Sequence, residues 1–324
     1  MKLATFRLET ESQASLRLGV LVETLEKPAL LDLLACPKAG HPTTVDADVN
    51  LPTAVLPLLR RGETGFGVVR DTVDSVLSQV SSLEDPEAGD VLVPLGDVTL
   101  GPAIPNPGKI ISAGLNFSEH VGEAASLTSD APECPMAFIK VSTTVSGHEQ
   151  PIILPQGVSD IDYEVELAIV IGKKGKRIAE ADAMDYVAGY AVFNDVSARA
   201  IQFREMEKGL LNLGKNFDTF GPLGPWLVTK DEIADVQDLD LMLRVNGELR
   251  QQGNTAQMIH SVSALVAYWS QMTLEPGDVI TSGTPSGVAA FREPDPTPYY
   301  LKPGDVVEAS IEGLGTLRNP VSSG

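Results

Sequence analysis

The sequence has few basic residues and no long apolar run. Lys and Arg together number 24 against 44 Asp and Glu, so the formal net charge is -20. Nucleic acids and anionic membranes bind proteins through basic surfaces, so we expect neither as a partner. A small anionic substrate held by a few local cations stays possible. No apolar run approaches the length of a membrane span, and the first residues lack the apolar core of a signal peptide, so we expect a cytoplasmic protein.

Cysteine is almost absent as well. Cys36 and Cys134 are the only two in the chain, and they form no CxxC motif. This number and spacing exclude a disulfide framework and suit a reducing cytosol.

The hydrophobic pattern predicts two regions. In the first hundred residues, 2–8 and 15–23 read as strands, whereas 28–35 and 64–83 have the apolar spacing of helices. A stretch rich in Pro and Gly at 84–109 predicts a boundary near residue 100. The remainder is mainly β. It has one predicted core helix at 261–272, Pro-Gly turns before two strands, and a Gly/Pro-rich loop at 216–225.

An acidic pair stands in an otherwise apolar strand. Glu164 and Glu166 lie two residues apart in DYEVELAIVIG and therefore share one face of the strand. Asp195 follows the apolar run YVAGYAVF, where a strand would end. Three carboxylates without a nearby Cys or His describe a site for Mg²⁺ or Mn²⁺. Glutamates on an edge strand and an aspartate in a turn are the alternative interpretation.

Further polar residues suggest a catalytic site. If NFSEHVGEA is helical, Glu123 lies on the same face as His120 and can raise the basicity of the imidazole; an exposed histidine is the alternative. Lys215 precedes the Gly/Pro-rich loop, where a lysine either faces an anionic ligand or is solvated. SGTPSGV lacks the Gly-Lys-Ser/Thr ending of a nucleotide-binding P-loop, although Thr284 in it could bind a carboxylate.

Several motifs in a fixed order resemble the fumarylacetoacetate hydrolase superfamily. They cover roughly residues 105 to 320. They are GLNFSEHVGEA, PMAFIK, DYEVELAIVIG, GYAVFNDVSAR, GKNFDTFGPLGPW, VNGELRQ, LEPGDVITSGTPSGV and LKPGDVV. The resemblance implies an α+β, mainly β fold: a β-roll of mixed sheets in a catalytic domain at 101–324, with a small α/β domain at 1–100. It also implies a homodimer.

The resemblance also assigns roles to individual residues. The metal ligands would be Glu164, Glu166 and Asp195, binding Mg²⁺ or Mn²⁺. The catalytic residues would be His120, Glu123 and Lys215, and the substrate contacts would be Arg199, Gln202 and Thr284.

Three positions depart from the usual family pattern. Ala113 stands where some relatives have an additional acidic ligand, which favours the subgroup with three carboxylates. Ala200 and Ala289 replace common residues of the motifs SARD and SGVG, and 291–300 form an unexpectedly long insert. None of these changes removes a predicted ligand, but they leave the substrate open.

The implied function is cleavage of a carbon–carbon bond in a small anionic β-diketone acid, such as an acylpyruvate or a diketo-deoxy sugar acid. A water activated by His120 would attack a carbonyl, and the metal and Lys215 would stabilise the enolate that leaves. A decarboxylase, or a keto–enol isomerase or hydratase, would use the same metal and is the alternative. A binding protein without activity would be expected to lack a ligand or the base, whereas this chain has the full set.

Overall fold

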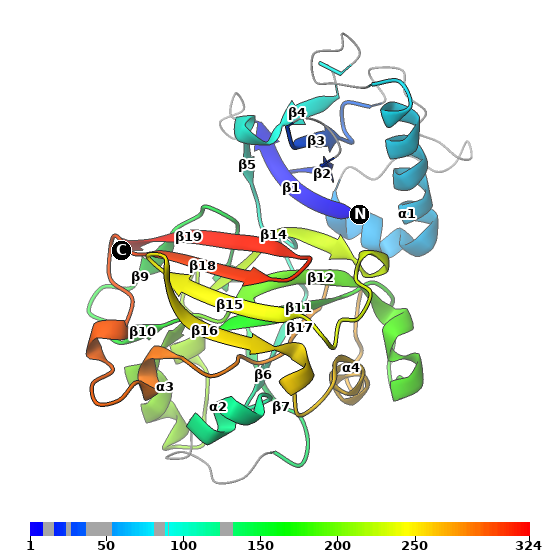
Figure 1. Cartoon of the computed structure of the whole chain (residues 1–324). Coiled ribbons are helices and arrows are strands. Elements are labelled where there is room, and N and C mark those ends of the chain that lie inside the picture. Colours follow the sequence, from blue (N-terminus) through cyan, green and yellow to red (C-terminus); the bar gives the residue numbers. More distant parts are fainter. Residues whose placement is uncertain (9–15, 24–26, 37–53, 81–87, 90, 124–131) are drawn as a thin grey trace.

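The computed structural model describes most of the chain (Figure 1). The described residues are 1–8, 16–23, 27–36, 54–80, 88–89, 91–123 and 132–324. Of the helices in these segments, none combines the length and the apolar character that a membrane span requires. The architecture is mainly β with few helices, as predicted.

The largest sheet runs through both halves of the chain. Its main path is β4 (Leu92–Pro94), β3 (Ala29–Asp32), β2 (Arg17–Val22), β1 (Lys2–Leu8), β14 (Gly221–Thr229), β12 (Val187–Asn194), β11 (Val165–Ile171), β17 (Val279–Thr281), β6 (Ile110–Gly114) and β7 (Met136–Lys140). Two short strands join it beside this path, β5 (Val98–Leu100) on β1 and β8 (Val145–Ser146) on β14. Most pairs are antiparallel, whereas β17 pairs with β6 in parallel, so the sheet is mixed.

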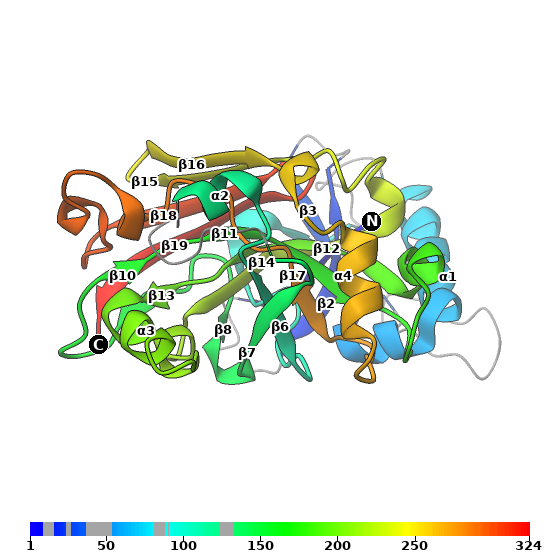
Figure 2. The ribbon, with the colours of Figure 1, turned by 90° about the horizontal axis from the view of Figure 1, so that it is seen from below.

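A second sheet packs across the first (Figures 1 and 2). Its strands are β16 (Glu248–Asn254), β15 (Asp240–Val245), β18 (Val306–Ile311), β19 (Gly315–Ser323) and β9 (Ile152–Leu154). Apolar side chains of both sheets form one buried cluster, which includes Leu167 of β11 and Leu243 of β15. A small ladder of β10 (Ile161–Asp162) and β13 (Ser197–Ala198) lies beside the ends of β11 and β12.

The helices lie around the sheets and not between them (Figure 2). They are α1 (Val55–Leu77), α2 (Ser118–Glu123), α3 (Arg199–Met206) and α4 (Val262–Trp269). The helix predicted at 261–272 is confirmed as α4, and Ser261 caps its first turn by accepting from the backbone N–H of Ala264 at 3.1 Å. The helix predicted at 64–83 corresponds to the part of α1 that follows Gly62, where the backbone leaves the helical conformation, and α1 ends at Leu77. Residues 81–83 lie outside the described residues.

Two segment predictions were wrong. Residues 28–35 form strand β3 followed by a turn, because residues 29–32 pair with β2 and β4 inside the large sheet. The Gly/Pro-rich stretch 216–225 is a loop only as far as Phe220, since β14 starts at Gly221. The register between β12 and β14 shifts between Tyr190 and Val192, and such an irregularity lets a strand contain proline.

The first hundred residues extend the large sheet. β1 pairs with β14, with Leu3 opposite Leu227, and α1 covers one face of β1 to β4 (Figure 1). The buried cluster under α1 combines residues of both regions, including Leu59 of α1 and Val170 of β11. The division into two domains near residue 100 stays a prediction.

Candidate active site

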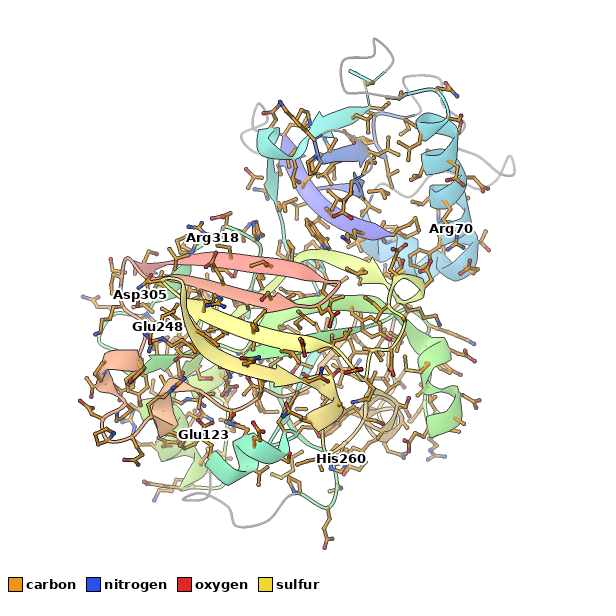
Figure 3. The ribbon with its side chains drawn as sticks, viewed as in Figure 1. Arg70, Glu123, Glu248, His260, Asp305 and Arg318 are labelled. Carbon is orange, nitrogen blue, oxygen red and sulfur yellow. The ribbon has the colours of Figure 1, made fainter. Side chains whose placement is uncertain are left out.

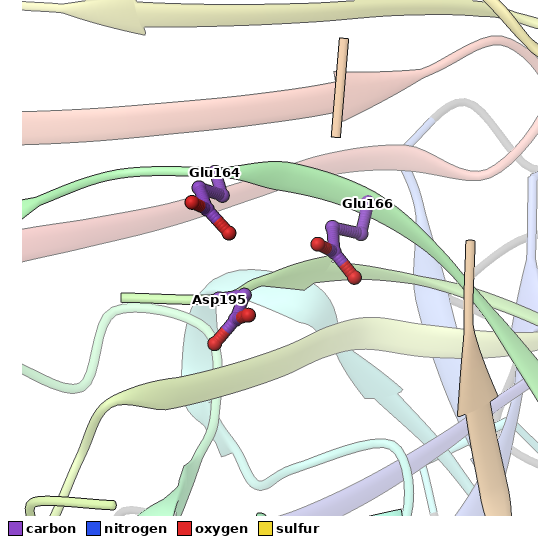
Figure 4. A group of neighbouring side chains, drawn as sticks. All are labelled: Glu164, Glu166 and Asp195. Carbon is purple, nitrogen blue, oxygen red and sulfur yellow. The ribbon is translucent and has the colours of Figure 1, made fainter. Parts of the chain in front are cut away.

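Three carboxylates meet where β11 and β12 pair (Figure 4). Glu164 comes just before β11, Glu166 is its second residue, and Asp195 follows β12. The backbone N–H of Asp195 donates to the carbonyl of Glu164 at 2.8 Å, which holds the two segments together. All three side chains are buried, and ligand oxygens from each lie within 4.8 Å of one another.

This group fits a hard divalent cation. Its donors are all carboxylate oxygens, which Mg²⁺ and Mn²⁺ prefer, and a cation would offset their mutual repulsion. Burial, with the nearby charges of Asp195 and Glu164, holds the pKa of Glu166 well above its ordinary value. Burial would also raise the pKa of Glu164, but Lys215 and Arg199 lower it to about 2. The role of the three residues as metal ligands stays a prediction.

Two buried lysines contact the carboxylates. Lys215 Nζ donates to Glu164 Oε2 and to Asp195 Oδ2, both at 2.8 Å, and Lys140 Nζ donates to Asp195 Oδ1 at 2.6 Å. Burial lowers the pKa of Lys140. For Lys215 burial acts in the same direction, but the charges of Asp195 and Glu164 outweigh it and raise its pKa. Lys215 therefore brings positive charge into the centre of the site, and Lys140 adds a second amino group that donates to Asp195.

Arg199 connects the carboxylates to a second layer of the site. It donates from Nε to Asp162 Oδ2 at 2.8 Å, from one terminal nitrogen to Glu164 Oε1 at 2.6 Å, and from the other to Gln202 Oε1 at 2.9 Å. Asp162 also accepts from the backbone N–H of Ala289 at 2.8 Å and of Ala290 at 3.0 Å. One buried carboxylate thus fixes both the arginine and the loop at 289–291.

His120 and Glu123 form the predicted pair on α2 (Figure 3 labels Glu123). His120 is 7% exposed, and its Nδ1 lies 3.1 Å from Glu123 Oε2. The other oxygen of Glu123 accepts from the backbone N–H of Gly287 at 2.9 Å, and the His120 ring lies 5.9 Å from that of Phe291. The carboxylate assigns the proton of the imidazole to Nδ1 and leaves Nε2 as the basic nitrogen.

Thr284 lies beside the start of β11. Its hydroxyl donates to the carbonyl of Val165 at 2.9 Å and accepts from Gln251 Nε2 at 2.8 Å. Gln251 Oε1 in turn accepts from the backbone N–H of Val165 at 3.0 Å. The hydroxyl of Thr284 therefore helps to hold the strand that carries Glu164 and Glu166. Its predicted substrate contact is untested.

The structure adds residues that the sequence reasoning did not assign to the site. They are Lys140, Asp162, Gln251 and Thr281, whose hydroxyl donates to Glu166. Lys140, Asp162 and Gln251 belong to motifs of the resemblance, PMAFIK, DYEVELAIVIG and VNGELRQ. Each of these motifs contains one of these charged or amide residues, and this is the feature of the sequence from which their place in the site could have been predicted.

The sequence and the structure are similar to those of several known proteins. Residues 109–322 match the family model "Fumarylacetoacetate (FAA) hydrolase C-terminal". A mitochondrial oxaloacetate tautomerase of Rattus norvegicus is 44% identical over 275 residues, 85% of this chain and 81% of that protein. Two solved structures cover all of both chains at 29% identity. A maleylpyruvate hydrolase of Sphingobium sp. SYK-6, in complex with manganese(II) and pyruvate, has a TM-score of 0.72, and a 5-carboxymethyl-2-hydroxymuconate delta-isomerase of Mycobacterium smegmatis has 0.70.

Proposed function

The chain belongs to the fumarylacetoacetate hydrolase family, and we propose that it is a metal-dependent keto–enol tautomerase of a short 2-oxo dicarboxylic acid such as oxaloacetate. The sequence favoured carbon–carbon bond hydrolysis, with a decarboxylase or a keto–enol isomerase or hydratase as the alternative. The alternative now has more support, because an oxaloacetate tautomerase is 44% identical over 85% of this chain. Relatives from Burkholderia of 45% identity are named hydrolases only as putative, and the maleylpyruvate hydrolase is 29% identical.

The geometric observation that carries the proposal is the buried His120–Glu123 pair. Tautomerisation needs one group that removes a proton from the carbon beside the keto group and returns it to the enol. His120 Nε2 is such a base, because Glu123 binds the opposite ring nitrogen and leaves Nε2 to accept the proton. Gly287 anchors Glu123, and Phe291 packs beside the imidazole ring, so the base has a fixed orientation.

The charges in the site suit an anionic substrate. Counted in their ionised forms, the four carboxylates of Asp162, Glu164, Glu166 and Asp195 exceed the three groups of Lys140, Lys215 and Arg199 by one. A divalent ion bound by Glu164, Glu166 and Asp195 would make the sum positive, and it would polarise the keto oxygen as a Lewis acid.

Lys215 adds positive charge where the enolate oxygen develops, and it is held there by two of the carboxylates. Arg199 keeps two N–H groups beyond its three bonds to side chains. Among the residues that the structure describes, the amide nitrogen of Gln202 has only the weak sulfur contact to Met206 at 3.8 Å. These donors can bind a carboxylate of the substrate.

Hydrolysis of a carbon–carbon bond is the second candidate. The same pair could take a proton from water instead of from carbon, and the maleylpyruvate hydrolase shares the fold. A decarboxylase would need only stabilisation of the enolate. The three reactions differ in the fate of the substrate carbon: it is conserved, divided between two acids, or lost as CO₂.

The deciding experiment follows oxaloacetate by proton NMR in D₂O, with diamagnetic Mg²⁺ or after chelation, against the same solutions without protein. A tautomerase converts the enol to the keto form and accelerates deuterium exchange beside the keto group, without loss of carbon. We expect His120→Ala to slow this exchange at least about 100-fold, the usual contribution of a general base. His148→Gln, at a histidine whose Nδ1 accepts from the backbone of Arg318, is the control. Release of CO₂, or cleavage of an acylpyruvate with no enol conversion, would contradict the proposal.

We also propose that the chain forms the homodimer predicted from its sequence. Large apolar side chains are exposed on β7 and on the segment after α3, among them Leu210, which is 66% exposed. Asn216 joins the two segments, because its side chain accepts from the backbone of Val141 and donates to that of Ile139. Exposed apolar residues that cluster in this way are typical of contact surfaces between subunits.

A further inference from the structure

A cavity outside the active site collects basic side chains. It has a volume of about 540 Å³ and lies between α1 and the ends of β11 and β14. Six of the residues that line it are cationic: Arg60, Arg61, Arg70, Lys173, Lys174 and Lys230. Three are acidic: Glu63, Asp185 and Asp231. The local charge is therefore positive in a chain whose net charge is -20.

The wall that α1 provides is packed closely against the sheet. A Cβ atom added to Gly277, in the turn before β17, would lie 2.2 Å from Leu56 of α1. The helix is interrupted at Gly62, whose φ of 57° favours glycine, and Gly62 itself lines the cavity. A second helical segment therefore starts in the wall, and its first backbone N–H groups add positive potential there.

Only some of the cationic side chains that line the cavity form ion pairs with carboxylates of the protein. Arg70, labelled in Figure 3 on α1, pairs with Glu63, and Lys174 Nζ lies 2.7 Å from Glu275. Within the described part of the chain, neither Arg60 nor Lys173 has a carboxylate within ion-pair distance. The ammonium of Lys173 lies 4.8 Å above the ring of Tyr186, a contact that leaves its donors accessible.

We infer that this cavity binds a small phosphorylated anion. Guanidinium groups from α1 match the oxygens of a phosphate, and ammonium groups from the segments that follow β11 and β14 add charge from the opposite wall. Phe66, Val187 and Pro276 provide an apolar surface in the same cavity. Its volume suits a small organic molecule, so a phosphate ester fits better than a bare ion. The bound anion would link α1 to the sheet that carries Glu166. The inference is independent of the reaction proposed above.

Titration calorimetry on the full-length protein tests this inference. The probes are pyrophosphate, adenosine diphosphate and citrate, in buffer stripped of divalent ions so that the phosphates form no metal complexes. We expect pyrophosphate or adenosine diphosphate to bind more tightly than citrate, and affinity to fall as salt is added. If adenosine diphosphate binds more tightly than pyrophosphate, the apolar surface of the cavity contacts the nucleoside. If the two affinities are equal, the cavity binds the phosphate groups alone.

Charge reversal locates the site. Arg60→Glu with Lys173→Glu should weaken phosphate binding at least about 100-fold, and neutral Gln replacements should have a smaller effect in the same direction. Arg7→Glu with Lys302→Glu makes the same change in net charge at exposed positions away from the cavity and should leave binding unchanged. No binding by either phosphate, tighter binding of citrate, or equal losses in the two double variants would overturn the inference.

Discussion

Asp162→Asn is the sharpest single test of how the site is built. Asp162 is fully buried and accepts four hydrogen bonds, from the backbone N–H groups of Tyr163, Ala289 and Ala290 and from Arg199 Nε. An asparagine of the same shape keeps one oxygen and turns an NH₂ group toward two donors. The loss includes a charge-assisted bond worth about 1.5–3 kcal/mol and leaves donors unpaired, so we expect a destabilisation of about 4 kcal/mol.

Two measurements separate the consequences of this substitution. With a urea slope of about 4 kcal/mol per M for a chain of this length, the unfolding midpoint should fall by about 1 M. Misplacement of Arg199 and of Phe291, which packs on His120, should lower kcat/KM for enol conversion about 100-fold. Asp97→Asn, at an exposed position, should change stability by no more than about 0.5 kcal/mol. An unchanged midpoint would refute the buried network. A lower midpoint with unchanged kcat/KM would refute its link to the base.

Three further predictions follow from the same structure. Glu166→Ala removes a proposed ligand and should weaken Mn²⁺ binding, measured by calorimetry, by more than about 100-fold; unchanged affinity would disprove the metal assignment. Cys134 is exposed, whereas burial together with Asp32 raises the pKa of Cys36 to about 12. A thiol reagent at pH 8 should therefore modify one cysteine in the native protein and two in urea, and two equally fast native reactions would contradict this. Ile139→Asp with Leu210→Asp should convert the proposed dimer to a monomer in sedimentation velocity, and a monomeric unmodified protein would refute the dimer.

Strands could be predicted from the sequence where the hydrophobic pattern fits a strand and no helix. The seven residues of β11 are all buried, and their continuous apolar run is typical of a strand covered on both faces. At 28–35 the same kind of run also fits one face of a helix, and the pairing of β3 with β2 and β4 decides the outcome. At β14, prolines suggested a loop because they cannot donate to a neighbouring strand. The irregular register beside β12 removes that obstacle.

The carboxylates could be found from sequence because Glu164 and Glu166 break an apolar strand locally. The groups that support them could not be found in this way. Lys140 reaches Asp195 across 55 residues, and Gln251 reaches the backbone of Val165 across 86. Neither contact leaves a periodic signal, because it depends on which strands become neighbours when the sheets form.

Because β1 pairs with β14, this part of the large sheet cannot form until the ribosome has synthesised residues far along the chain. Positions 3 and 227 face each other in that ladder, 224 residues apart in the chain. At a synthesis rate of about 5–20 residues per second, β1 leaves the ribosome about 10 to 45 s before its partner exists. During that interval the first residues of β1, which pair with β14, lack their native neighbour and are open to other chains, whereas residues 6–8 can already pair with β5. Faster translation of the intervening residues shortens this exposure, whereas pauses before residue 227 lengthen it.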